Sequence, residues 1–207
     1  MARNLGSKCK QCRREKVKLF LKGERCETHC PIDKKGPVLP GQKGSKFSFK
    51  RMSDYGRQLR EKQKVKKIYG ISETQLKNYF QKAFKSKHST SELLLQMLES
   101  RLDNVVYRLG FVPSRSLARQ VVSHKHILVD GKKVNLPSYH LKPEQTITLG
   151  PKILEMASVK KALADKKVKM PDWLKRKAAV GQIVRMPNRD EIEADIDDQL
   201  IVEYYSR

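Results

Sequence analysis

The feature that most constrains this chain is a net positive charge that is very large for its length. Its 207 residues include 45 Lys and Arg against 22 Asp and Glu, a formal charge of +23 at pH 7. Positive charges at this density repel one another in a compact chain, so folding is most favourable when a polyanion supplies the missing counter-charge. The charge therefore favours a nucleic acid as the main partner.

The positive charge is distributed unevenly along the chain. Residues 1–90 hold 25 Lys and Arg against 7 Asp and Glu, whereas the segment from Pro187 onward is acidic. The two ends attract each other, and we expect the tail to fold back onto the basic first half. The acidic residues of the tail are Asp190, Glu191, Glu193, Asp195, Asp197, Asp198 and Glu203.

An anionic membrane surface is the main rival partner. It is disfavoured because no amphipathic helix pairs its basic face with an exposed aromatic face. No stretch approaches the ~18 apolar residues of a membrane span, and the N-terminal residues lack the apolar core of a secretory signal. We therefore expect a cytoplasmic protein without a membrane partner.

The cysteines form two close pairs near the N-terminus. Cys9 and Cys12 are separated by two residues, Cys26 and Cys30 by three, and thirteen residues lie between the pairs. Two such pairs joined by a loop suit tetrahedral thiolate coordination of zinc. A metal would also supply the folding energy that residues 1–50 lack, because glycines and prolines interrupt them. The spacing predicts one structural zinc ion with no ligand position open for catalysis.

Three alternatives bear on this site. His29 lies between Cys26 and Cys30 and could replace one of them as a ligand. An iron–sulfur cluster also accepts four thiolates. Disulfides would require an oxidising compartment, for which the sequence carries no export signal.

Helical periodicity begins after residue 52. Residues 54–69 are rich in helix formers, Asp54 can cap this helix and Gly70 is suited to end it. Ser72 and Gln75 have the spacing of a capping box that starts a second helix. Apolar residues then recur at steps of three and four, and we expect them to form core: Leu76, Tyr79, Phe80, Ala83 and Phe84.

A compact α+β module follows. A helix is predicted over residues 92–110, and Ser114 caps a shorter one over residues 115–123. The period then changes to two, and Asp130-Gly131 is a strong hairpin-turn signal. The expected strands cover residues 127–129, 132–134, 147–149 and, more weakly, 182–184. The predicted fold class is α+β, with a mainly helical basic N-terminal domain that carries the cysteine segment.

The run from Arg101 to His124, continuing through residues 127–131, resembles the small RNA-binding module named after ribosomal protein S-four. The start of its second helix and the basic side chains around it suit phosphates. Arg115, Arg119, Gln120 and Lys125 are expected to project from the polar face of that helix, with Lys132 and Lys133 after the turn. His124 and His126 could equally be packed hinge residues.

Residues 53–64, 69–71, 171–174 and 200–206 are similar to the bacterial S-four ribosomal protein family, in the same order. The cysteines resemble those of its zinc-carrying subset. The resemblance implies a structural protein of the small ribosomal subunit that binds 16S rRNA at a helix junction of the 5′ domain early in assembly. It implies S-three and S-five as neighbouring proteins and a place near the channel through which mRNA enters. The best matches to the family's mRNA-channel residues are Lys46, Lys50 and Arg51.

The resemblance also implies that the second domain is inserted into the first. We expect a metal-binding segment over residues 1–50, a helical part over 51–95, an RNA-binding domain over 96–190 with its core at 99–150, and the tail over 191–207. The residues expected to contact rRNA are Arg3, Lys8, Arg13, Arg14, Tyr55, Arg57, Arg60, Lys62, Lys64, Lys66, Lys67, Arg115, Arg119, Gln120, His124, Lys125, Lys132 and Lys133.

Catalysis is not expected. The sequence shows no glycine-rich phosphate loop, no Ser-His-Asp pattern and no converging acid and base residues, so no small-molecule substrate is predicted. A zinc-dependent DNA-binding regulator would need a recognition helix after the metal segment. The remaining alternatives are a free RNA-binding regulator and an RNA-modification protein that carries the same module.

Overall fold

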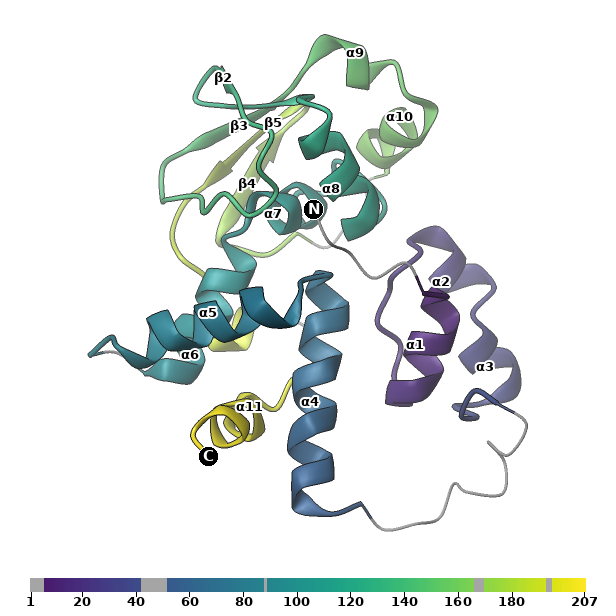
Figure 1. The fold of residues 1–207 in the computed structure, drawn as a ribbon. Helices are drawn as coiled ribbons and strands as arrows, with labels where there is room; N and C mark the ends of the chain where they lie inside the picture. The colour runs from purple at the N-terminus through teal and green to yellow at the C-terminus, as the bar shows by residue number, and fades with distance from the viewer. Residues whose placement is uncertain (1–5, 42–51, 88, 166–169, 193–194) are drawn as a thin grey trace. The chain divides into compact units, whose positions relative to one another are not determined.

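The computed structural model describes residues 6–41, 52–87, 89–165, 170–192 and 195–207 (Figure 1). Backbone contacts divide the chain into two compact units. Unit one joins Met1–Ser91 with Ala194–Arg207, and unit two is Glu92–Glu193. None of the described helices has the length and apolar character that a bilayer span requires.

The described secondary structure of unit one is helical. Ser53 is the N-cap of the longest helix, because its hydroxyl accepts a hydrogen bond from the Gly56 N–H, so the expectation of Asp54 as the cap is corrected. The same helix ends at Gly70 with φ +62°, and the predicted capping box of Ser72 and Gln75 is present. The helices are α1 (Lys8–Glu15), α2 (Glu24–Thr28), α3 (Pro31–Lys35), α4 (Asp54–Tyr69), α5 (Glu73–Phe84) and α11 (Asp198–Tyr205).

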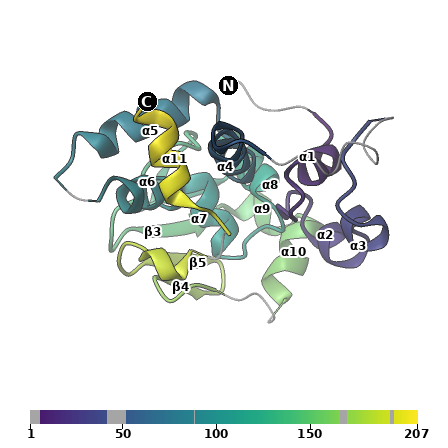
Figure 2. The same ribbon diagram turned by 90° about the horizontal axis from the view of Figure 1, so that it is seen from below.

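The C-terminal helix α11 lies beside α4 and α5 in both views (Figures 1 and 2). Its Tyr205 ring stacks on Phe80 of α5 with 4.9 Å between ring centroids, and Tyr204 lies 5.9 Å from Tyr55 of α4. Ile201 is fully buried among these helices. The end of the acidic tail, from residue 195 onward, thus packs in unit one against the basic helix to which its charge is complementary. Asp190 and Glu191, in contrast, belong to unit two, where Glu191 pairs with Arg185.

The cysteine segment contributes almost nothing to a hydrophobic core. Among described residues 6–41, the buried apolar side chains are Leu19, Cys12 and Cys30. Its helices have eight, five and five residues, which is too short for independent stability. Interactions other than apolar packing must therefore hold α1, α2 and α3 together.

Unit two is a layer of helices on an antiparallel sheet. The strand order is β2-β1-β3-β5-β4, and Leu128 of β1 pairs with Thr148 of β3. The core joins Val105 of α7, Val121 of α8 and Ile147 of β3, all at most 2% exposed. The elements are α6 (Thr90–Glu99), α7 (Leu102–Arg108), α8 (Arg115–Ser123), β1 (Ile127–Val129), β2 (Lys132–Lys133), β3 (Thr146–Leu149), α9 (Pro151–Leu154), α10 (Ala157–Ala164), β4 (Leu174–Lys177), β5 (Val180–Ile183) and the 3-10 turn η1 (Arg189–Glu191).

The single helix expected over residues 92–110 is wrong, because the chain breaks at Ser100 and Arg101. Arg101 has extended backbone and pairs with His140 as an isolated bridge. The Leu102 N–H donates to the Tyr139 carbonyl at 2.8 Å, and the Leu141 N–H donates to the Ser100 carbonyl at 2.9 Å. These bonds to a distant loop replace two helical bonds, so apolar periodicity continues across a break that local sequence does not show.

We expect Gly181→Ala to destabilise unit two. A Cβ at Gly181 would lie 2.8 Å from Cδ2 of Leu109, which is fully buried, so the core would have to shift. Overpacking of this kind costs about 1–3 kcal/mol of unfolding free energy, measurable by urea denaturation. The same substitution in a Leu109→Ala background should cost clearly less. An equal cost in both backgrounds would contradict the packing explanation.

Candidate RNA-binding surface and metal centre

Helix α8 begins as expected at Ser114, whose hydroxyl accepts a hydrogen bond from the Leu117 N–H at 3.3 Å. Toward its end, Gln120, His124 and Lys125 are all exposed. Lys125 has φ +62°, which turns the chain toward β1. The end of α8 therefore offers an exposed cation together with a neutral donor and a titratable ring.

Arg115 is held by α7. Its Nε donates to Oδ1 of Asn104 at 2.8 Å, and its guanidinium lies 4.5 Å from the centre of the Tyr107 ring. Asn104 in turn donates to Oε2 of Glu99 at 2.7 Å. A partly exposed guanidinium fixed in this way loses little conformational entropy when it binds an anion. Sequence reasoning missed Asn104 and Tyr107 as supports, although their positions on one helix face are a detectable signal.

Arg119 is mostly enclosed, so the expectation that it projects from α8 is wrong. Only 12% of its side chain is exposed, and Nη1 lies 3.8 Å from Oδ2 of Asp103. The same carboxylate accepts two hydrogen bonds, at 3.0 and 2.7 Å, from the fully buried Arg101. Arg119 therefore contributes to joining α8 to α7.

The hairpin presents Lys132 and Lys133, both exposed. Its turn is fastened by Asp130, whose Oδ1 accepts the Thr146 N–H at 2.8 Å and whose Oδ2 accepts from Gln145 at 2.9 Å. The backbone hydrogen bond from Thr146 holds the pKa of Asp130 below its ordinary value. The two lysines are thus carried by a turn of fixed geometry, as phosphate recognition requires.

On α4, the burial of Lys62 and Lys64 argues against the expectation that they contact RNA. Their exposed fractions are 4% and 5%. Lys62 Nζ lies 2.8 Å from Oε1 of Glu73, and Lys64 Nζ lies 3.4 Å from carboxylate oxygens of both Glu61 and Asp195. Both ammonium groups therefore have internal counter-ions and little access to a polyanion.

The electrostatics around Lys62 show how firmly it is held. Burial alone would lower the pKa of Lys62, but its hydrogen bond to Glu73 raises it above the ordinary value. Burial likewise acts to raise the pKa of Glu73, and the hydrogen bonds from Lys62, Tyr205 and Lys66 lower it. Lys62 also lies 4.2 Å from the centre of the Tyr204 ring. The ammonium group joins α4, α5 and α11.

Other basic residues of α4 are also ion-paired. Arg60 and Lys67 both pair with Glu15 of α1, and Lys66 lies 3.2 Å from Glu73. Tyr55 is 50% exposed and Arg57 is exposed. The open face of α4 is therefore restricted to its first turns.

The remaining expected contacts lie near the N-terminus. Arg14 is exposed, and Lys8 and Arg13 are partly exposed on α1. Arg3 and the mRNA-channel candidates Lys46, Lys50 and Arg51 lie outside the described residues.

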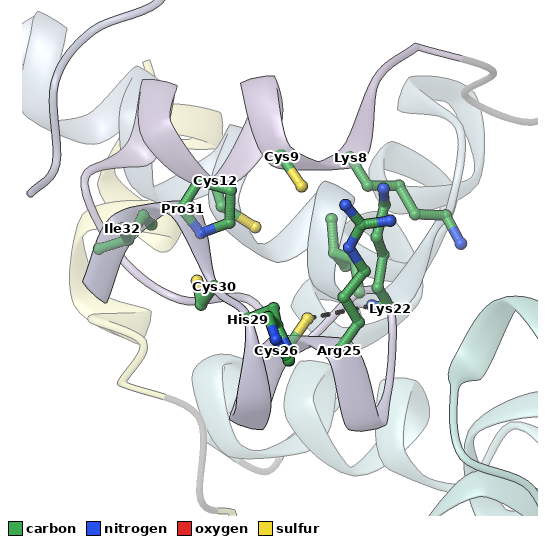
Figure 3. A pocket seen from close by; sticks show the side chains of 11 residues that line it. Lys8, Cys9, Cys12, Lys22, Arg25, Cys26, His29, Cys30, Pro31 and Ile32 are labelled. Atoms are coloured by element: carbon green, nitrogen blue, oxygen red, sulfur yellow. Dashed lines mark hydrogen bonds between the residues drawn. The ribbon is translucent and has the colours of Figure 1, made fainter. Parts of the chain in front are cut away.

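The four cysteines line one hollow between α1, α2 and the start of α3 (Figure 3). Its volume is about 20 Å³, enough for roughly one water-sized occupant. All four thiols are unoxidised, and Cys12 and Cys30 are buried. His29 also lines the hollow but is exposed. Of the two adjacent candidate ligands, His29 and Cys30, Cys30 is the more deeply buried.

The surroundings of the hollow suit thiolates. The Lys22 N–H donates to the Cys26 sulfur at 3.3 Å, and Lys8, Lys22 and Arg25 line the walls. Burial raises the pKa of the Cys12 thiol, a backbone hydrogen bond from Leu19 lowers it, and the three other thiols are close enough to raise it further. Cationic walls and N–H donors to sulfur are features of thiolate metal sites. The residues therefore fit a soft divalent metal.

The side chains do not meet at a single point. Among the described residues, no three Cys, His, Asp or Glu side chains are close enough together to hold an ion as they stand. The backbone nevertheless returns on itself here through unusual conformations. Lys16 has φ +60° and Phe20 has φ +47°, which non-glycine residues adopt at a cost. An additional interaction is needed to compensate for that cost.

Comparison with known proteins agrees with the module and its surroundings. A model described as the ribosomal protein S4/S9 N-terminal domain matches residues 3–99, and the S4 domain model matches residues 100–147. The small ribosomal subunit protein uS4 of Natranaerobius thermophilus is 49% identical over the full length of both chains. This chain belongs to the uS4 family.

Other uS4 proteins are similarly close. Those of Thermodesulfovibrio yellowstonii and Thermus thermophilus are 48% and 46% identical, again over both chains in full. The family is structural, which confirms the expectation that the chain is not an enzyme. Membership of the uS4 family also confirms the resemblance to the bacterial S-four ribosomal proteins.

We expect Lys62→Gln to reduce stability rather than RNA affinity. Removing one partner of a buried ion pair typically costs about 3–5 kcal/mol. The cost should be smaller here, because Glu73 keeps its ion pair with Lys66 and is partly exposed. Thermal and urea unfolding would measure it. The matched variant Lys132→Gln, which changes net charge equally, should leave stability unchanged and weaken RNA binding. The assignment of Lys62 would be wrong if the two variants behaved alike.

Proposed function

We propose that this protein is a structural component of the small ribosomal subunit that binds 16S rRNA, and that it acts in translation on cytoplasmic ribosomes. The observation that carries the proposal is similarity to uS4 proteins along the whole chain, at up to 49% identity. The exposed cations at the end of α8 and on the hairpin agree with it, because phosphate contacts position a protein on RNA.

The proposal extends to assembly. The protein binds early, at a helix junction of the 5′ domain, with S-three and S-five as neighbours and the mRNA channel nearby. The resemblance of residues 53–64 and 200–206 to the family supports this placement. In unit two, the hairpin and α8 rest on a continuous apolar core, which provides a folded platform for RNA contacts.

Binding of 16S rRNA should weaken steeply as salt rises, because each neutralised phosphate releases counterions and lowers log K by about 0.9 per decade of salt for duplex. Filter binding between 50 and 200 mM KCl, as rough limits, measures the slope. The double variant Lys132→Gln, Lys133→Gln should make the slope less steep by the amount expected for about two lost phosphate contacts. The double variant Lys34→Gln, Lys35→Gln serves as the charge-matched control. A slope that is flat in the wild type would contradict the proposal.

We further propose that Cys9, Cys12, Cys26 and Cys30 hold one structural Zn²⁺, as in the zinc-carrying subset of the family. The shared hollow, the N–H donor to Cys26 and the near absence of an apolar core support it. The sulfurs would have to close in by side-chain rotation. The ion would then supply the folding energy that α1, α2 and α3 lack.

Replacing Cys9 and Cys12 by Ser should abolish metal binding and disorder the N-terminal segment while unit two remains folded. Elemental analysis should find one equivalent of zinc in the wild type and none in the variant. Iron in the wild-type protein would indicate an iron–sulfur cluster instead. Amide dispersion in NMR reports on the folding of each unit, and Thr28→Ser in α2 serves as the control. A metal-free variant that keeps its N-terminal dispersion would refute the structural role.

A further inference from the structure

Phe84 is exposed although the sequence pattern places it in the core. Leu76, Tyr79, Phe80 and Ala83 are at most 7% exposed, as expected, whereas Phe84 is 61% exposed, so the prediction for Phe84 is wrong. Phe84 is the last residue of α5, and the chain turns into a loop directly after it. Its aromatic ring is the most exposed large apolar side chain among the described residues.

The exposed ring is supported from below by other rings. Phe84 stacks on Phe80 with centroids 5.8 Å apart and 23° between planes, and Phe80 stacks on Tyr205 at 4.9 Å and 28°. The Tyr205 hydroxyl donates to Oε1 of Glu73 at 2.9 Å, which anchors the innermost ring. The stack of Tyr205, Phe80 and Phe84 therefore supports the exposed Phe84 ring on two rings beneath it.

The charged residues next to Phe84 along the chain are all basic. Residues 74–91 contain no Asp or Glu, and their four lysines, Lys77, Lys82, Lys85 and Lys87, are all exposed. Among the described residues none of the four forms an ion pair, unlike the lysines of α4. The C-terminal end of a helix carries roughly half a negative charge, which favours a nearby cation. This effect accounts for one lysine near the end of α5 but not for three.

We propose that Phe84, with Lys82, Lys85 and Lys87, forms a binding site for unpaired RNA, in which a base stacks on the ring and the lysines contact the flanking phosphates. The site lies on unit one and is separate from the surface of α8 and the hairpin. Aromatic rings in a basic setting are how proteins bind unpaired nucleotides, whereas a duplex keeps its bases stacked internally. An apolar protein segment could cover the ring but would leave the surrounding lysines without counter-charge.

A tryptophan probe tests the site locally. In Phe84→Trp, a single-stranded adenylate 12-mer should quench the new emission, while the same RNA annealed to its complement should not, because its bases are not free to stack. Trp173 is 1% exposed and provides a constant background. Val38→Trp is the control, since it places an exposed tryptophan near Lys34 and Lys35. Absence of quenching at position 84, or equal quenching at both positions, would overturn the proposal.

Substitutions at Phe84 separate stacking from apolar docking. Phe84→Tyr should retain affinity for the single strand, whereas Phe84→Ala and Phe84→Leu should both lose about tenfold. If Phe84→Leu binds as well as the wild type, the aromatic face is not used and the proposal fails. Because Lys132→Gln with Lys133→Gln should leave the quenching at position 84 intact, loss of this site and loss of the proposed 16S rRNA binding can be distinguished.

Discussion

The structure depends on the neutralisation of α4. This helix carries lysines whose side chains point into the protein, and each of three other segments brings a carboxylate to them: Glu15 from α1, Glu73 from α5 and Asp195 before α11. Buried ion pairs seldom add stability over apolar packing, but a buried charge without its partner is strongly destabilising. All three segments thus supply counter-charges within unit one, which includes residues 194–207 despite their position in the sequence.

This arrangement divides the cations of the chain into two classes. Lys62 and Lys64 form ion pairs inside the folded protein. Arg101 and Arg119 are likewise paired with Asp103. The cations at the end of α8, on β2 and at the end of α5 are exposed. The total of 45 Lys and Arg thus overstates the number of side chains that can meet a polyanion, because some of them are ion-paired inside the protein.

Local signals in the sequence were sufficient for several caps, for the hairpin turn and for the strands beside it. They were not sufficient for the cap of α4, which is Ser53, or for strand β4, which was not predicted. The capping box at Ser72, the N-cap at Ser114 and the hairpin turn at Asp130 depend on residues within a few positions of one another. The break at Arg101 could not be predicted because its hydrogen bonds come from residues near 140. The burial of Lys62 could not be predicted either, since the Tyr204 ring that covers it lies at the other end of the chain. The family resemblance supplied the overall organisation that periodicity alone did not.

The two units are stabilised by different interactions, and in unit one the ion pairs are connected to the proposed RNA-binding ring. Unit two has a continuous apolar core, so the exposed side chains proposed to bind RNA rest on packed helices and strands. Unit one replaces much of that core with ion pairs and aromatic rings. Lys62 holds Glu73, Glu73 holds the Tyr205 hydroxyl, and Tyr205 supports Phe80 beneath Phe84. The exposed ring is therefore connected through successive contacts to a buried lysine of α4. Weakening that ion pair should loosen the ring without removing any group that touches RNA.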